Sequence, residues 1–344
     1  MLELLQKLSP LSGVSSRETP VRECIRAIAE PFVDEAHVDS FGNLILFKKG
    51  KKSIRNGVLI DAGMDETGVM VSGFTDSGAL RFQTVGNLDR RNLIGKKVYL
   101  GQERVLGVFG MKPIHLSTKE ERKSVPKEKE LYLDIGCTNR KDAEAQIPLG
   151  TVGVFEDVCG LFGEDLFYGK ALRSRTGCAV LLKLLQEELP IDCTFVFSAQ
   201  REVGARGAFG SAFSVRPQMA LTLDGFPAED YPGIEPEDVC SVGNGPVLSR
   251  YCPRIGLDRM LFEMIKGCAE ASSIPFQIQG TTSVQDGAGI YATRGAGCRV
   301  AALSIPVRYQ KSPIGVVSLK DCQRTLDLTR VFLDQVTDCL ERGV

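Results

Sequence analysis

The stretch that decides the fold is GVLIDAGMDETGVMV, which occupies residues 57–71. Its first part is a continuous apolar run that ends at Asp61, and such a run predicts a buried strand. From Gly68 to about Glu156 the pattern changes to short segments in which apolar and polar residues alternate. Alternation with a period of two predicts half-buried strands. We therefore expect a change of domain at residues 66–67.

Helical and strand patterns alternate on both sides of this β-rich segment, which is typical of an α/β domain. The expected helices lie at about 18–31, 176–189, 207–214, 257–271 and 319–341. The expected strands are GVLIDA, CTFVFS, MALTLD, FQIQ and RVAALSI, with a hairpin in AHVDSFGNLILFKK. We predict an α/β domain built from residues 1–66 plus 160–344, which is interrupted by an inserted β domain at 67–159.

Composition excludes several classes of function. The formal net charge of -1 argues against nucleic acid or an anionic membrane as the main partner. The eleven cysteines show no paired C-x-x-C spacing, and no apolar run is long enough to span a membrane. A cytoplasmic protein without a disulfide framework is the expectation. The densely charged stretch HLSTKEERKSVPKEKE, residues 115–130, is expected to form a mobile loop.

Seven further segments, together with GVLIDAGMDETGVMV, resemble the motifs of one known family. They are LSGVSSRETPVRE, DSFGNL, GMKPIHL, LYLDIG, GKALRSRTGCAVLL, FSAQREVGARGA and IPVRYQKSP. In order and spacing they resemble the glutamyl aminopeptidase family, the tetrahedral (TET) dinuclear metalloaminopeptidases. The resemblance implies a phosphorylase/hydrolase-like mixed sheet flanked by helices, with an inserted small PDZ-like β-barrel that serves dimerisation.

The family, as the resemblance implies, removes N-terminal residues from peptides with two zinc or cobalt ions, which activate a water molecule while a glutamate takes its proton. Five of the matching positions here carry other residues, and one of them is Ser174, which replaces the second aspartate of the family's Asp-Asp pair. The first histidine ligand falls on Gly63, the bridging aspartate on Arg173, the catalytic glutamate on Arg201 and the last histidine on Lys311. Glycine has no side chain to offer, and arginine is neither a ligand nor a base. We therefore expect no functional catalytic residue and no metal cofactor.

Three acidic positions of the family remain, which are Asp65, Glu202 and Asp224. In the family the first orients a ligand and the other two hold metal. Unpaired buried carboxylates are costly, so we expect Arg173, Arg201 and Lys311 to form a salt-bridged cluster with them. An open alternative is that these cations bind a carboxylate or a phosphate, since arginine matches such anions in two-pronged contacts.

The expected function is that of an aminopeptidase-like protein without catalysis, in a structural, regulatory or ligand-binding role. Its expected partners are further copies of itself, from a dimer up to a dodecamer, or an active homologue. A peptide or a small anion is the expected ligand of the old cleft. The alternative is a metal-dependent aminopeptidase with an altered site that acts on peptide N-termini.

Overall fold

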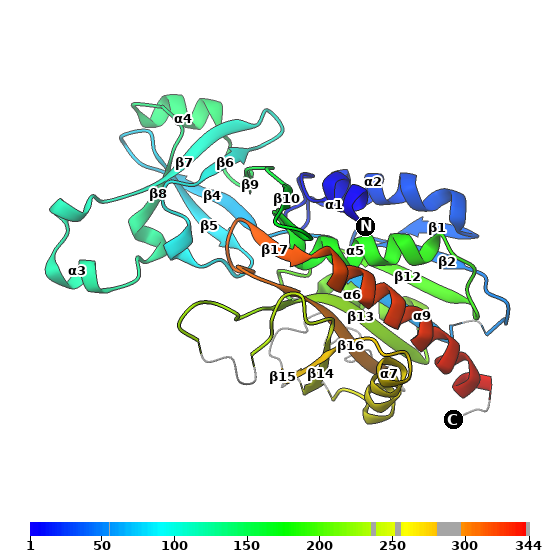
Figure 1. Cartoon of the computed structure of the whole chain (residues 1–344). Helices are drawn as coiled ribbons and strands as arrows, with labels where there is room; N and C mark the ends of the chain where they lie inside the picture. The colour runs from blue at the N-terminus through cyan, green and yellow to red at the C-terminus, as the bar shows by residue number, and fades with distance from the viewer. Residues whose placement is uncertain (55, 235–238, 252–255, 281–296, 342–344) are drawn as a thin grey trace.

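The computed structural model describes residues 1–54, 56–234, 239–251, 256–280 and 297–341. Its larger part is a sheet covered by helices, and a small barrel projects from one end of it (Figure 1). The chain enters the barrel after β3 (Val58–Gly63) and leaves it after β9 (Val152–Phe155). The domain boundaries at 67 and 159 stay a prediction.

A mixed eight-stranded sheet forms the centre of the larger part. In spatial order its strands are β1 (Glu35–Val38), β2 (Leu44–Lys48), β12 (Cys193–Ser198), β3, β13 (Met219–Pro227), β16 (Arg299–Val307), β14 (Val247–Tyr251) and β15 (Gln277–Gly280). The strands β12, β3, β13 and β16 run parallel to one another. Their carboxyl ends therefore meet at one edge of the sheet. The predicted strands in this region are confirmed.

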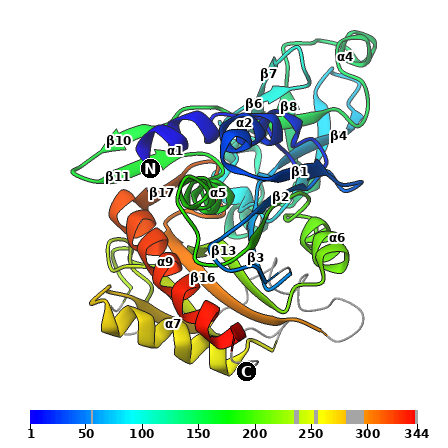
Figure 2. The same ribbon diagram turned by 90° about the vertical axis from the view of Figure 1, so that its right-hand side faces the viewer.

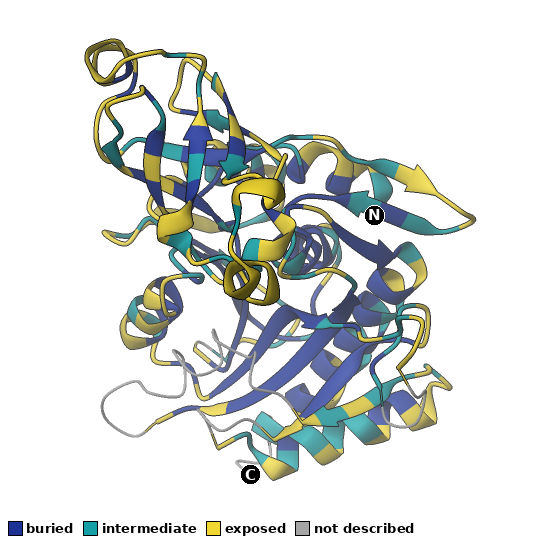
Figure 3. Cartoon of the chain, turned by 90° about the vertical axis from the view of Figure 1, so that its left-hand side faces the viewer, coloured by how far each residue is buried: buried dark blue, intermediate teal, exposed yellow. Residues whose placement is uncertain are grey.

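Helices cover both faces of the sheet, as Figure 2 shows. One face carries α1 (Leu2–Leu8), α2 (Thr19–Ala29), α5 (Leu172–Leu185), α7 (Arg259–Ala271) and α9 (Leu319–Glu341), and the other carries α6 (Arg206–Val215). The main core lies between α5, α9 and the central strands, which are buried along their length (Figure 3). None of the helices described is long and apolar enough to cross a membrane.

The inserted part is a closed barrel of antiparallel strands. Its strands in order are β4 (Gly68–Phe74), β5 (Leu80–Val85), β8 (Leu131–Asp134), β7 (Val105–Met111), β6 (Lys97–Leu100) and β9. A separate apolar core fills it, with Phe109 packed between Phe82 and Phe155. The barrel also carries the short helices α3 (Lys119–Lys123) and α4 (Arg140–Gln146).

Some sequence expectations need correction. The charged stretch 115–130 is not a loop throughout, because α3 forms within it under a capping box between Thr118 and Glu121. Helix α5 begins at Leu172 rather than 176, since its polar first turn is buried and hides the helical period. The pattern also missed β14 and a three-stranded sheet made of β10 (Gly160–Phe162), β11 (Leu166–Gly169) and β17 (Gly315–Ser318).

Candidate functional site

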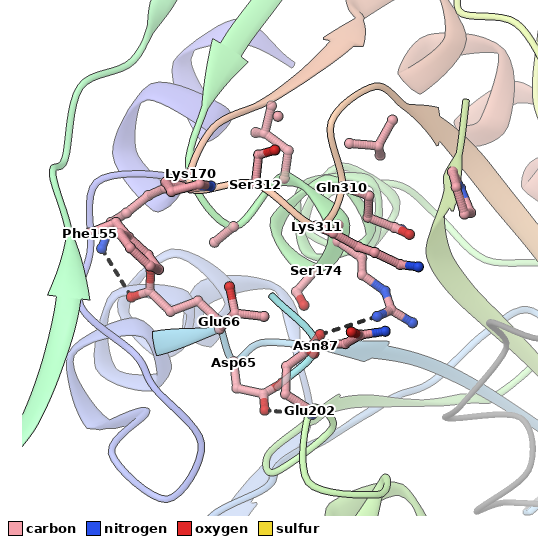
Figure 4. Close-up of a pocket in the computed structure, with 18 of the residues that line it drawn as sticks. Asp65, Glu66, Asn87, Phe155, Lys170, Ser174, Glu202, Gln310, Lys311 and Ser312 are labelled. Carbon is pink, nitrogen blue, oxygen red and sulfur yellow. Dashed lines mark hydrogen bonds and ion pairs between the residues drawn. The ribbon is translucent and has the colours of Figure 1, made fainter. Parts of the chain in front are cut away.

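A cavity of about 270 Å³ lies where the carboxyl ends of β3, β13 and β16 meet the barrel. In open α/β sheets this edge is the usual place for a ligand. Glu66 and Lys170 lie on one side of the cavity, whereas Glu202, Asn87 and Lys311 lie on the other (Figure 4). Asn87 belongs to the barrel, so both parts of the chain contribute to the lining.

Arg201 is the centre of the charged cluster below this cavity, and its side chain is fully buried. Its Nη1 donates to Glu202 Oε1 at 2.7 Å, and its Nη2 donates to Asp224 Oδ1. Arg201 and Glu202 follow β12, whereas Asp224 lies in β13. One guanidinium group therefore joins two carboxylates that strands distant in sequence bring together.

Arg173, in the first turn of α5, supplies the second cation of the cluster. Its Nη1 lies 3.4 Å from Glu202 Oε1, and its Nη2 lies 3.5 Å from Asp224 Oδ2. Two guanidinium groups thus face two carboxylates, and the four charges balance. We refer to these four residues as the ion-pair cluster.

Both turns that place these arginines contain a residue other than glycine in the left-handed region. Ala171, two residues before Arg173, and Gln200, directly before Arg201, each have a φ of 57°. Such conformations cost about 1 kcal/mol or more and persist where the surrounding structure enforces them. Both arginines are therefore placed by constrained turns of the backbone.

Asp65 supports the cluster from the loop after β3. Its Oδ2 accepts hydrogen bonds from Ser15 Oγ at 2.5 Å and from the backbone N–H of Glu202 at 2.9 Å. Burial raises the pKa of Asp65 to about 7, and the charge of Glu202 adds to this effect. Asp65 therefore fixes the backbone that carries Arg201 and Glu202.

A second buried ion pair, which sequence reasoning missed, lies on the opposite wall. Lys170 Nζ contacts Glu66 Oε1 at 3.0 Å, and both side chains are 2% exposed. The same carboxylate oxygen accepts from the backbone N–H of Gly13, and Arg175 lies 4.0 Å from it. Burial lowers the pKa of Lys170. The sequence did contain a signal for this pair. Glu66 and Lys170 stand in two of the segments that carry the resemblance.

Three of the positions singled out in the sequence lie outside the ion-pair cluster. Asp65 was expected to pair with the cations, but it accepts from Ser15 and the Glu202 N–H and makes no ion pair with any described residue. Gly63 ends β3, and its carbonyl accepts from the Cys178 thiol at 3.2 Å.

Lys311 was expected to join the cluster, and the structure corrects this. It lies on the loop after β16 at the exposed rim of the cavity, where its carbonyl accepts from the N–H of Asp89 in the barrel. Within the described residues its ammonium group makes no ion pair.

Asp61 is an acid on the same sheet that the resemblance does not explain. It is fully buried in β3 beside Thr222 of β13, and among the described residues neither carboxylate oxygen makes a hydrogen bond of normal geometry. Burial raises its pKa to about 7, although the neighbouring Ser198 hydroxyl and Arg201 oppose the shift. The folded protein therefore holds a proton that the unfolded chain releases near pH 4.

The free energy of unfolding of the Asp61→Asn variant should depend on pH less than that of the wild type, because the variant lacks this buried acid. The raised pKa makes wild-type stability fall as pH rises from about 4 to about 7, because the folded state binds the proton more tightly. We expect the variant to gain about 2–4 kcal/mol in the free energy of unfolding at pH 8, and little at pH 4. Urea denaturation at both pH values measures this, with Thr222→Val as the control that alters no titratable group. An equal gain at both pH values would contradict it.

Comparison with known proteins agrees with this fold. Residues 42–328 match the M42 glutamyl aminopeptidase family. The chain belongs to this family. A protein of Acetivibrio thermocellus is 35% identical over 95% of this chain and 97% of its own length. The predicted family and the predicted mixed α/β fold with an inserted barrel are confirmed.

Solved structures of the family are close to this one. The TET aminopeptidase of the marine sediment archaeon Thaumarchaeota archaeon SCGC AB-539-E09 has a TM-score of 0.91 at 29% identity, with 98% of each chain covered. The TET1 peptidase of Pyrococcus horikoshii has a TM-score of 0.83 at 29% identity, with 96% of this chain and 98% of that chain covered. The latter is described as able to assemble into a tetrahedron or a large octahedral shell.

The two divalent ions that the resemblance implies do not fit the side chains found at the matching positions. The guanidinium group of Arg201 lies between Glu202 and Asp224, where it binds one oxygen of each carboxylate that would have to ligate. Gly63 offers no side chain, and Arg173 adds a second cation. Within the described ranges, no group of three or more histidines, cysteines or acids is arranged to hold a metal. The side chains at these positions therefore do not make up a two-metal site.

Proposed function

We propose that this member of the aminopeptidase family does not hydrolyse peptides and instead uses its cleft to bind a ligand. The observation that carries the proposal is the position of Arg201, which bridges Glu202 and Asp224 as a fully buried cation. A carboxylate held in this way is not available to a dication. A dication that displaced the arginine would break both ion pairs and leave the buried guanidinium group without these partners, which costs several kcal/mol.

The same residue removes the proton acceptor. The resemblance places the family's catalytic glutamate at Arg201, and a guanidinium group cannot take a proton from water near neutral pH. The neighbouring Glu202 already accepts from Arg201, with Arg173 nearby. Both requirements of two-metal hydrolysis, the ligands and the base, are therefore weakened by the same substitution. No metal cofactor is part of the proposal.

A combined measurement of metal content and turnover tests this function. The purified full chain is incubated with excess zinc or cobalt, passed through a desalting column and analysed by mass spectrometry. A panel of amino-acid amides and short peptides is assayed in parallel. We expect metal well below one ion per chain and no turnover above the buffer rate. Near-stoichiometric metal together with turnover would overturn the proposal in favour of an aminopeptidase with an altered site.

We also infer that the protein assembles with copies of itself. The support is the barrel, which is complete and closed although the metal positions have changed, together with the assembly described for the P. horikoshii relative. Assembly with an active homologue is the second kind of oligomer that we propose. A cytoplasmic location is part of the proposal. Analytical ultracentrifugation of the chain alone tests self-assembly, and a mass equal to one chain would count against it.

A further inference from the structure

We propose that the cavity binds a small zwitterion, a free α-amino acid or a short peptide, between Lys311 and Glu229. The inference rests on the proposed function, because it takes the cavity to be a binding site. It goes further in naming the chemistry of the ligand and the two residues that recognise its ends.

The charges at the floor of the cavity are already engaged with one another. Glu202 and Asp224 accept from Arg201, and Glu66 pairs with Lys170. The Oδ2 of Asp65 accepts from Ser15 and from a backbone N–H. A ligand that competed for these groups would have to break buried ion pairs, which is costly. The floor therefore presents a neutralised surface.

Two charged residues of the cavity lining differ from the floor in their exposure and in their ion pairing. Lys311 and Glu229 are both exposed, and among the residues described neither side chain forms an ion pair. They do not pair with each other either, although both follow neighbouring parallel strands, β16 and β13. One positive and one negative group thus line the same cavity outside any ion pair of the described residues. The pKa of Asp89 in the barrel is lowered first by its hydrogen bond with Arg91 and to a smaller extent by the charge of Lys311, so Lys311 also faces this acid. A ligand that carries a carboxylate at one end and an ammonium group at the other matches this arrangement.

The loops that carry these two groups are fixed to each other. Asp230, next to Glu229, receives two hydrogen bonds from Arg308, with Nε at 2.8 Å and Nη2 at 2.5 Å. Tyr231 and Tyr309 stack with ring centroids 5.5 Å apart, and the Tyr309 N–H donates to the Tyr231 hydroxyl oxygen. Because the two loops are locked before a ligand arrives, binding loses less conformational entropy.

Further contacts hold the Lys311 loop on its other sides. Gln310 Nε2 donates to the carbonyl of Gly225 at 2.6 Å, and Ser312 Oγ accepts from Asn92 of the barrel at 2.7 Å. The main chain of Glu229 donates to the carbonyl of Cys240. The spacing between the two backbone positions that carry the charges is therefore set by the fold rather than by the ligand.

The size and the remaining lining restrict the ligand to a small molecule. The cavity of about 270 Å³ lies just below the range of sites for drug-sized ligands. Besides its charged residues it is lined by apolar side chains of Leu172, Pro227 and Val307. An amino acid with an apolar side chain, such as leucine, is a suitable first probe.

Calorimetry with leucine and its two capped forms tests the proposal. Leucine has both charges, N-acetylleucine has only the carboxylate, and leucinamide has only the ammonium group. The wild-type chain is expected to bind leucine about five- to tenfold more tightly than either capped form, since each lost ionic contact is worth roughly 1 kcal/mol. Titrations are done in a chelator so that leucinamide stays intact.

Two matched variants assign the ends of the ligand. Lys311→Met is expected to weaken leucine and N-acetylleucine about five- to tenfold and to leave leucinamide unchanged, whereas Glu229→Gln should weaken leucine and leucinamide and leave N-acetylleucine unchanged. Both side chains are exposed, so thermal unfolding should match that of the wild type. Absence of leucine binding, or an equal loss of all three ligands in both variants, would overturn the proposal.

The zwitterion site and the loss of catalysis can be refuted independently of each other. Turnover of leucinamide with added metal would refute the loss of catalysis, whatever the two variants show. No turnover together with no leucine binding would retain the loss of catalysis and refute the zwitterion site.

Discussion

Replacing Arg201 with methionine is expected to lower the free energy of unfolding by about 3–5 kcal/mol. The substitution keeps much of the volume of the side chain but removes the guanidinium group that joins Glu202 to Asp224. Arg173 would then face two buried carboxylates alone, at the longer distances of 3.4 and 3.5 Å. Urea denaturation at pH 7.5 measures the loss.

Two further variants show whether charge is the cause. The triple variant Arg201→Met, Glu202→Gln, Asp224→Asn should recover part of the loss, because it removes the unpaired charges as well. Arg173→Met should cost less than Arg201→Met, since the Arg173 side chain is 14% exposed and makes the longer contacts. If Arg201→Met lowered the free energy of unfolding by less than about 1 kcal/mol, the ion pairs would contribute no more than a surface salt bridge. The interpretation of the ion-pair cluster as a buried, stabilising unit would then be wrong.

The second large effect is a gain of metal binding, which should require four substitutions at once. Gly63→His, Arg173→Asp, Arg201→Glu and Lys311→His together supply imidazole and carboxylate groups at the four ligand and base positions that changed. The retained Asp65 is already fixed by hydrogen bonds to Ser15 and to the Glu202 backbone. We expect the zinc content of this variant to rise from background to near one or two ions per chain.

The single variant Arg201→Glu is the matched control for this gain. It adds a carboxylate beside Glu202 and Asp224 without supplying the other ligands, and ligand sets act together in binding a metal. We expect it to take up no zinc and to be less stable than the wild type, because three acids would face Arg173. Zinc uptake by the single variant, measured by mass spectrometry after desalting, would refute this interpretation.

The order of helices and strands could be predicted because local pattern determines it. The apolar run that became β3 and the 3.6-residue period of the helix at α7 are visible within a few residues. The beginning of α5 was misplaced for a physical reason. Its first turn contains Arg173, Ser174 and Arg175, and polar residues there suggest a surface, whereas tertiary contacts bury or partly bury all three. Strand β14 was missed because it is short and half exposed, with little period to detect.

The chemical capacity of each site residue was determined by the sequence alone. Glycine at 63 cannot ligate and arginine at 201 cannot accept a proton in any fold, because these are properties of the side chain itself. Only the tertiary structure decided which charges meet. Parallel pairing of β12, β3 and β13 brings Arg201 between Glu202 and Asp224, while the loop after β16 leaves Lys311 at the rim. The pairing of charges depends on distances of a few ångströms between segments far apart in the chain, and packing sets these distances.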